Sequence, residues 1–106
     1  MKIIRLISAC FTLGLFLTQP VHAVQTVPTA LELTIDGAIT PAVQEYLTRG
    51  IHSAEQNGVE LVILQLNTPG GSLDPMQKMA QDIRASTVPV VVYVWPRGAW
   101  AASAGT

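Results

Sequence analysis

The sequence predicts an α/β fold in which parallel strands alternate with helices. Three observations support it: three short stretches have the composition of strands, two amphipathic stretches between them have the length of helices, and glycine or proline separates the segments. Strands joined by helices pair in parallel, and ligands then bind at the carboxyl ends of the strands. A functional site is therefore expected in the loops at residues 67–72 and 96–105.

The first strand and the first helix are predicted from residues 30–58. Apolar and polar side chains alternate with a period of two over residues 30–35, and Asp36-Gly37 ends this strand. Thr40 then occupies an N-cap position and Pro41 the first helical position. The apolar stripe of this helix consists of Val43, Leu47, Ile51 and Ala54. The helix is expected to end at about Gly58.

The second strand, the second helix and the third strand follow. Residues 61–66 form a nearly continuous apolar run, which is typical of a strand covered on both faces. Ser72 or Asp74 can cap the next helix. Its predicted apolar face consists of Leu73, Met76, Ala80 and Ile83. Pro89 precedes the third strand, predicted over residues 90–95.

The first 23 residues have the three-part pattern of a secretory signal peptide. Two positive charges lie between Met1 and Arg5, residues 6–18 are apolar, and Val21-His22-Ala23 is a suitable cleavage site. This apolar run is shorter than the roughly 20 residues that cross a bilayer as a helix, so cleavage is expected rather than anchoring. The positive N-terminus predicts export through the inner membrane, to a periplasmic or extracytoplasmic face.

Composition excludes several classes of function. The chain has a net charge of −1, and residues 24–106 carry 4 basic and 7 acidic groups, a balance of −3 that predicts no nucleic-acid binding. Cys10 is the only cysteine and lies in the leader, with no apolar core before it as a lipoprotein signal would need. Thiol chemistry is therefore excluded from residues 24–106. No group of His, Asp or Glu has ligand spacing, so no metal or cofactor is predicted.

One folded domain is the simplest organisation. We expect a signal peptide at residues 1–23, a linker at residues 24–29, and a single domain over residues 30–106. Three strands are marginal for an α/β domain that stands alone. We therefore interpret residues 30–106 as the N-terminal part of a larger domain.

Two loops contain the candidate catalytic groups. Small residues surround the hydroxyl of Ser103, and a helix beginning there would place it among amide donors that favour an oxyanion, as nucleophilic attack on a carbonyl requires. Gly70 and Gly71 can bring backbone N–H groups against a substrate. The N–H groups of Gly71 and Ala104 could converge as an oxyanion hole.

The residues alone leave other interpretations of these loops open. Paired glycines after a strand often form only a turn, and Ala-Ala-Ser-Ala often indicates close helix packing. Phosphate binding is not supported, because neither Gly-x-Gly-x-x-Gly nor a Gly-Lys-Ser/Thr ending is present.

The order of the two loop motifs resembles the NfeD family of membrane-bound ClpP-class serine proteases. Leu66-Asn67-Thr68-Pro69-Gly70-Gly71 is similar to a loop shared by ClpP and its relatives, and residues 98–106, Gly-Ala-Trp-Ala-Ala-Ser-Ala-Gly-Thr, are similar to NfeD more narrowly. The resemblance implies a ClpP/crotonase-like spiral of βαβ units, incomplete in this chain. It also implies Ser103 as nucleophile and the amides of Gly71 and Ala104 as oxyanion hole, with Gly70 and Trp100 in substrate binding.

The resemblance implies a lysine general base downstream of the serine, and no such lysine follows Ser103 here. Lys78 and His52 lie on predicted helices and are interpreted as surface residues. The 106-residue chain is therefore expected to be inactive by itself. Tyr93 and Trp95 are expected to pack in a core or interface, whereas Trp100 is equally consistent with packing and with a substrate cleft.

Three functions follow from these considerations. The first is a Ser-Lys endopeptidase that hydrolyses membrane-associated or exported proteins. The second is a non-catalytic scaffold of the same fold in a membrane complex, and the third is a crotonase-type acyl-thioester enzyme, which a secretory leader disfavours. As partners, the resemblance implies a peptide or protein substrate, a stomatin-like membrane protein and homo-oligomerisation, with membrane association of the full-length protein.

Overall fold

The computed structural model describes residues 27–105. The predicted signal peptide and residues 24–26 of the predicted linker lie outside the described residues. The elements are β1 (Ala30–Asp36), α2 (Pro41–Gln56), β2 (Leu61–Asn67), α3 (Leu73–Ala85), β3 (Val90–Val94) and a short 3-10 turn, η1 (Ser103–Gly105). The predicted order β-α-β-α-β is confirmed.

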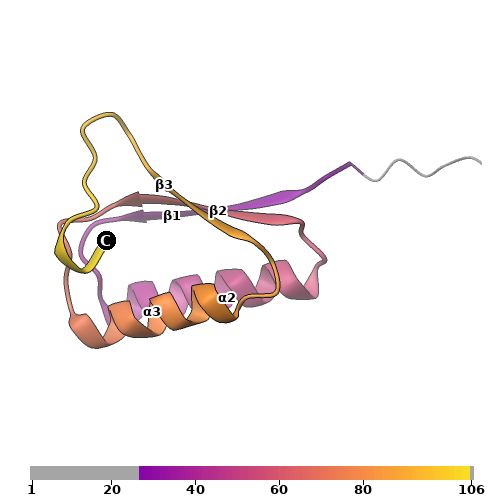
Figure 1. Cartoon of the computed structure of the whole chain (residues 1–106), viewed down its shortest axis with the longest axis horizontal. Coiled ribbons are helices and arrows are strands. Elements are labelled where there is room, and N and C mark those ends of the chain that lie inside the picture. The colour runs from indigo at the N-terminus through magenta and orange to yellow at the C-terminus, as the bar shows by residue number, and fades with distance from the viewer. Residues whose placement is uncertain (1–26, 106) are drawn as a thin grey trace, which may run out of the picture.

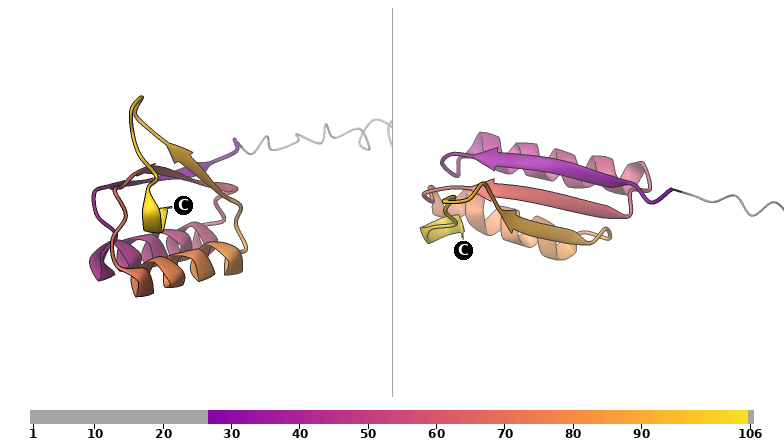
Figure 2. Two further views of the ribbon diagram at one scale, coloured as in Figure 1. Left: turned by 60° about the vertical axis from the view of Figure 1, so that its left-hand side comes forward. Right: turned by 90° about the horizontal axis from the view of Figure 1, so that it is seen from above.

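The three strands form one parallel sheet in the order β1-β2-β3. In its register Ile35 pairs with Leu66, and Leu66 pairs with Val94. Both helices lie on the same face of this sheet, so the described part of the chain has two layers (Figures 1 and 2). No helix in residues 27–105 is long and apolar enough to span a bilayer.

The core lies between the sheet and the two helices. Its strand residues alternate along the chain, because successive side chains of a strand point to opposite faces. They are Leu33, Ile35, Val62, Leu64 and Leu66. Helix α2 contributes Leu47, Ile51 and Ala54, with Val43 packed at the margin, which confirms the predicted stripe. The Thr40 hydroxyl accepts from the Val43 N–H at 3.3 Å, as expected of an N-cap.

The end of α2 and the start of α3 show small departures from the prediction. Helix α2 ends at Gln56 rather than near Gly58, because Gly58 adopts a left-handed φ of 65° that a helix cannot continue. At the start of α3 the Ser72 side chain occupies the N-cap position without a capping hydrogen bond. The first turn buries Pro75, whereas Leu73 is 60% exposed, so the prediction that Leu73 shares the apolar face was wrong.

The expectation that β2 is covered on both faces was wrong for the described residues. Buried and half-buried residues alternate along β2, because α2 and α3 cover one face of the sheet only. Tyr93 and Trp95, predicted to pack in a core or an interface, are 52% and 51% exposed, so they do not pack in the core of the described residues, and packing at an interface stays a prediction. Strand β3 ends at Val94, although the Trp95 N–H still donates to the Leu66 carbonyl at 3.2 Å.

Candidate active site

The two candidate loops meet at the carboxyl end of the sheet, where sequence analysis expected a site. Thr68, just beyond β2, pairs with Ala101 in a parallel bridge. The Thr68 N–H donates to the Trp100 carbonyl at 2.6 Å, and the Ala102 N–H donates to the Thr68 carbonyl at 3.1 Å. These two bonds hold the chain that leads to Ser103 against the start of the glycine loop.

Ser103 has a left-handed backbone conformation that is unusual for a residue with a side chain. Its φ is 52°, its side chain is exposed, and it begins η1. Such a φ costs about 1–2 kcal/mol for an L-residue. Strained residues of this kind cluster at active sites, where the surrounding structure holds them. The composition of the loop predicted a tight turn but gave no signal for this φ.

Gly71 packs directly against the backbone of Ile39. The Ile39 N–H donates to the Gly70 carbonyl and the Ser72 N–H to the Ile39 carbonyl, both at 2.9 Å. Ile39 and Gly71 thus form a parallel bridge in which Gly70 and Ser72, and not Gly71 itself, make the hydrogen bonds with Ile39. The N–H of Gly71 therefore points away from Ile39. A Cβ at Gly71 would lie 2.2 Å from the Ile39 carbonyl oxygen. Only glycine fits here, and its exposed amide points outward.

Gly70 is buried and has a φ of 105°. Its N–H donates to the Thr68 Oγ1 at 3.1 Å, and its carbonyl accepts from the Ile39 N–H. Both of its backbone groups are therefore used inside the chain, and substrate contact at Gly70 stays a prediction. Thr68 is fully buried, and its hydroxyl orients the glycine loop. Sequence analysis did not single out Thr68, because a threonine beside a proline carries no catalytic signal.

The remaining predicted site residues lie on or beside the second loop. Figure 1 shows that the chain after β3 projects beyond the sheet and then returns. Its bond with the Thr68 N–H places the Trp100 carbonyl beside the end of β2. The Trp100 side chain is 66% exposed, so it does not pack in the core of the described residues, and its contact with substrate stays a prediction. Ala104 directly follows Ser103 within η1.

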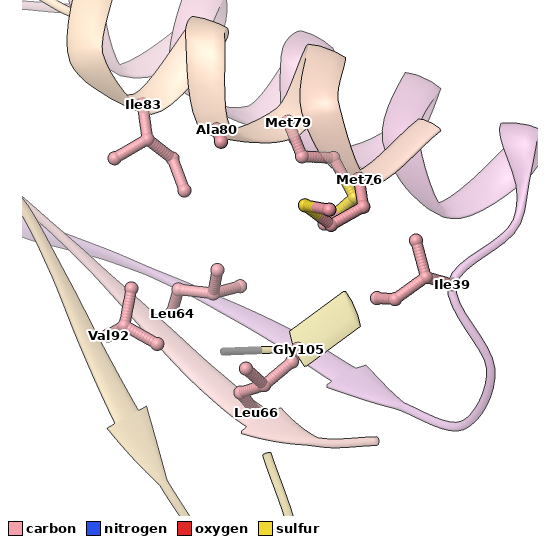
Figure 3. A pocket seen from close by; sticks show the side chains of 9 residues that line it. All are labelled: Ile39, Leu64, Leu66, Met76, Met79, Ala80, Ile83, Val92 and Gly105. Atoms are coloured by element: carbon pink, nitrogen blue, oxygen red, sulfur yellow. The ribbon is translucent and has the colours of Figure 1, made fainter. Parts of the chain in front are cut away.

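An apolar cavity of about 210 Å³ lies under the turn that carries Ser103 (Figure 3). Strand residues and α3 residues form its walls, and Gly105 closes one side. The wall residues include Leu64, Leu66, Val92, Met76, Met79 and Ile83. The candidate nucleophile is thus two residues from an apolar cavity.

Neither Lys78 nor His52 belongs to the candidate site. Lys78 is exposed on α3 and lines a surface pocket with Gln44 and Ser72. His52 is exposed on α2, in a pocket beside Asp82. Among residues 27–105, no group of three His, Cys, Asp or Glu side chains could hold a metal ion.

Comparison with known proteins identifies the family. The family described as NfeD1b, N-terminal domain matches residues 29–106. The chain belongs to this family. The NfeD resemblance predicted from the two loop motifs is therefore confirmed. Over 92 residues the chain is 44% identical to the membrane-bound protease PH1510 of Pyrococcus horikoshii, covering 87% of this chain and 20% of that protein. The chain spans about a fifth of the length of this relative.

Solved structures confirm the fold class of this NfeD1b chain. A serine-to-alanine mutant of the 1510-N membrane-bound stomatin-specific protease aligns with a TM-score of 0.73 and 40% identity, over 76% of this chain and 39% of that one. A lysine-to-alanine mutant of the same protease, in complex with a substrate peptide, aligns with a TM-score of 0.71 and 43% identity, over 73% of this chain and 35% of that one. A mutant of ClpP1 from Listeria monocytogenes aligns with a TM-score of 0.64 and 22% identity, over 70% of this chain and 42% of that one. At this identity the likeness shows the ClpP-like fold alone.

Proposed function

We propose that this chain carries the nucleophile of a serine endopeptidase of the Ser-Lys type, which hydrolyses peptide bonds of membrane-associated or exported proteins. The observation that carries this proposal is the left-handed conformation of Ser103, which directly follows a segment that Trp100 and Ala102 bond to Thr68 in the glycine loop. The exposed Gly71 amide and the apolar cavity under the turn are consistent with a peptide-binding site.

In the proposed mechanism the Ser103 Oγ attacks the carbonyl carbon of the scissile bond. Its proton passes to a neutral lysine, and the N–H groups of Gly71 and Ala104 stabilise the oxyanion, by about 3 kcal/mol for each donor. The leaving amine takes the proton from the lysine, and water then hydrolyses the acyl-enzyme. The lysine must be neutral near pH 7, which burial achieves by lowering its pKa.

The base of this mechanism lies outside the described residues. Lys2 and Lys78 are the lysines of the sequence, and Lys78 is an exposed residue of α3 in a surface pocket with Gln44 and Ser72. The solved relatives include a serine mutant and a lysine mutant, the latter with a bound substrate peptide. Replacement of a serine and a lysine to study a protease supports the Ser-Lys assignment.

The proposed substrate is an extended peptide segment of a membrane protein of the stomatin type. This proposal draws on the solved relatives, which include a stomatin-specific protease. Trp100, exposed at the return of the loop, is proposed to contact apolar side chains of that peptide. The predicted leader places this activity on the extracytoplasmic side of the membrane, and self-association remains a prediction of the family resemblance.

A chimaera tests the proposed nucleophile. The 106-residue chain is joined to the remaining residues of the relative's protease domain, which supply the lysine, and hydrolysis of the relative's substrate peptide is measured. We expect activity that Ser103→Ala abolishes and that Ser53→Ala, on the exposed side of α2, leaves unchanged. Equal activity of the Ser103→Ala chimaera would refute the assignment and favour a non-catalytic scaffold. The chain by itself is expected to show no turnover.

A further inference from the structure

Asn67, the last residue of β2, connects three segments at the carboxyl end of the sheet. Its Nδ2 donates to the Asp36 Oδ1 at 2.9 Å, and its Oδ1 accepts from the Trp100 N–H at 3.0 Å. Its own carbonyl accepts from the Gly37 N–H at 2.9 Å. One side chain thus joins the end of β1 to the loop that returns toward Ser103.

The chemistry of these contacts requires a carboxamide. An ionised Asp36 only accepts hydrogen bonds, and the Trp100 N–H only donates, so the residue between them must donate at one end and accept at the other. Aspartate at position 67 keeps an acceptor, but repulsion from the Asp36 carboxylate would turn it away from Asp36 and weaken its bond with the Trp100 N–H. A leucine would leave both partners without their bond.

The returning loop depends on few attachments. Its main-chain bonds to Thr68 form whatever side chain occupies position 67. The indole of Trp100 is 66% exposed and packs too little to hold the loop in place. The bond from the Trp100 N–H to Asn67 is an attachment of this loop that a single side-chain substitution can weaken.

We propose that Asn67 is a positioning residue for the nucleophile. By fixing the Trp100 amide relative to β1 and β2, it holds the chain that follows so that Ser103 keeps its left-handed conformation. This inference rests on the proposed function of Ser103. Because Asn67 acts through the loop backbone, its loss lowers kcat and leaves KM nearly unchanged. Misplacement of a reacting group by about 1 Å can cost about 100-fold in rate.

Asn67→Asp tests this role in the chimaera of the whole chain. We expect kcat to fall about 10- to 100-fold near neutral pH, with KM within about twofold of the unsubstituted chimaera. The double variant Asp36→Asn with Asn67→Asp exchanges donor and acceptor and should restore kcat.

Gln65 provides a matched control. It donates through Nε2 to the Glu32 carboxylate on the same face of the same two strands, and it does not contact the loop. Gln65→Glu introduces the same kind of carboxylate pair, yet kcat and KM should match those of the parent. If Gln65→Glu and Asn67→Asp behave alike, the effect is a general weakening of the sheet and the proposal is wrong.

The outcomes separate this inference from the proposed function. Loss of activity in Ser103→Ala together with an unchanged kcat in Asn67→Asp would overturn the role of Asn67 alone. If no chimaera is active, the role of Asn67 is tested instead by hydrogen exchange of the Trp100 amide in the 106-residue chain. Its protection factor should fall at least about tenfold in Asn67→Asp and recover in the double variant; equal protection in all three chains would overturn the proposal.

Discussion

Gly71→Ala tests whether close contact with Ile39 fixes the glycine loop. The φ of Gly71 does not lie in the left-handed region, so alanine can adopt the backbone conformation and the obstacle is space alone. The new Cβ would lie 2.2 Å from the Ile39 carbonyl oxygen, whereas ordinary contact begins near 3.4 Å. The two segments must therefore separate by about 1.2 Å, the difference between these distances.

That separation has a definable energetic cost. Ile39 is 2% exposed, so its displacement disturbs the core, and overpacking of this kind costs about 1–3 kcal/mol. Two hydrogen bonds of 2.9 Å between Ile39 and the glycine loop would also lengthen beyond bonding distance, at about 1 kcal/mol each. We expect Gly71→Ala to lower the free energy of unfolding by roughly 3–5 kcal/mol.

Urea unfolding of the 106-residue chain, followed by far-UV circular dichroism, measures this loss. Gly58→Ala is the control, because Gly58 has a φ of 65° and no atom within 4 Å of the new Cβ. It should cost only the left-handed penalty of about 1 kcal/mol. If Gly71→Ala lowers the free energy of unfolding by no more than Gly58→Ala, the contact with Ile39 does not constrain the loop.

Three further predictions concern single side chains. Thr68→Val removes the hydroxyl that accepts from the Gly70 N–H and should lower the free energy of unfolding by about 1–3 kcal/mol in urea unfolding, whereas Thr68→Ser should recover most of it. Hydrogen bonds from the Thr87 backbone N–H and then from its hydroxyl lower the pKa of Glu55. The stability that these bonds contribute is therefore present above the ordinary pKa of 4.5 and is lost as pH falls through the lower pKa of the folded state. Glu55→Gln should reduce the loss of stability on acidification, measured as the shift in the urea midpoint. Trp100→Ala should raise KM of the chimaera for an apolar peptide about 3- to 10-fold with little change in kcat, and an unchanged KM would exclude its proposed contact with substrate.

The secondary structure was predictable because local chemistry and tertiary packing agree. The stripe of α2 repeats at helical spacing and Thr40 caps it, so the helix that forms is the one the pattern favours. Leu73 departs from its pattern because the first residue of α3 lies at the edge of the layer, where α2 does not cover it. An apolar run such as β2 indicates burial, but it does not indicate how many faces are covered.

The site was predictable in its residue types and not in its geometry. Small residues around Ser103 indicated a tight turn, whereas its φ of 52° depends on bonds to a loop about 35 positions earlier in the sequence. Asn67 was missed for the same reason. A polar residue at a strand end usually ends the strand, and only the structure shows that its amide joins Asp36 to Trp100.

The exposed third strand has a consequence for handling the isolated chain. Residues 91–94 are each at least 44% exposed, and the sequence from Val90 to Trp95 contains no charge. As the last strand of the described sheet, β3 presents backbone donors and acceptors along its outer edge. An uncharged, apolar edge of this kind is a template for pairing with another chain, and natural proteins normally block it with lysine, proline or a covering element. Pro89 and Pro96 flank this strand but leave its central residues open to pairing, so purified chain should associate edge to edge as its concentration rises.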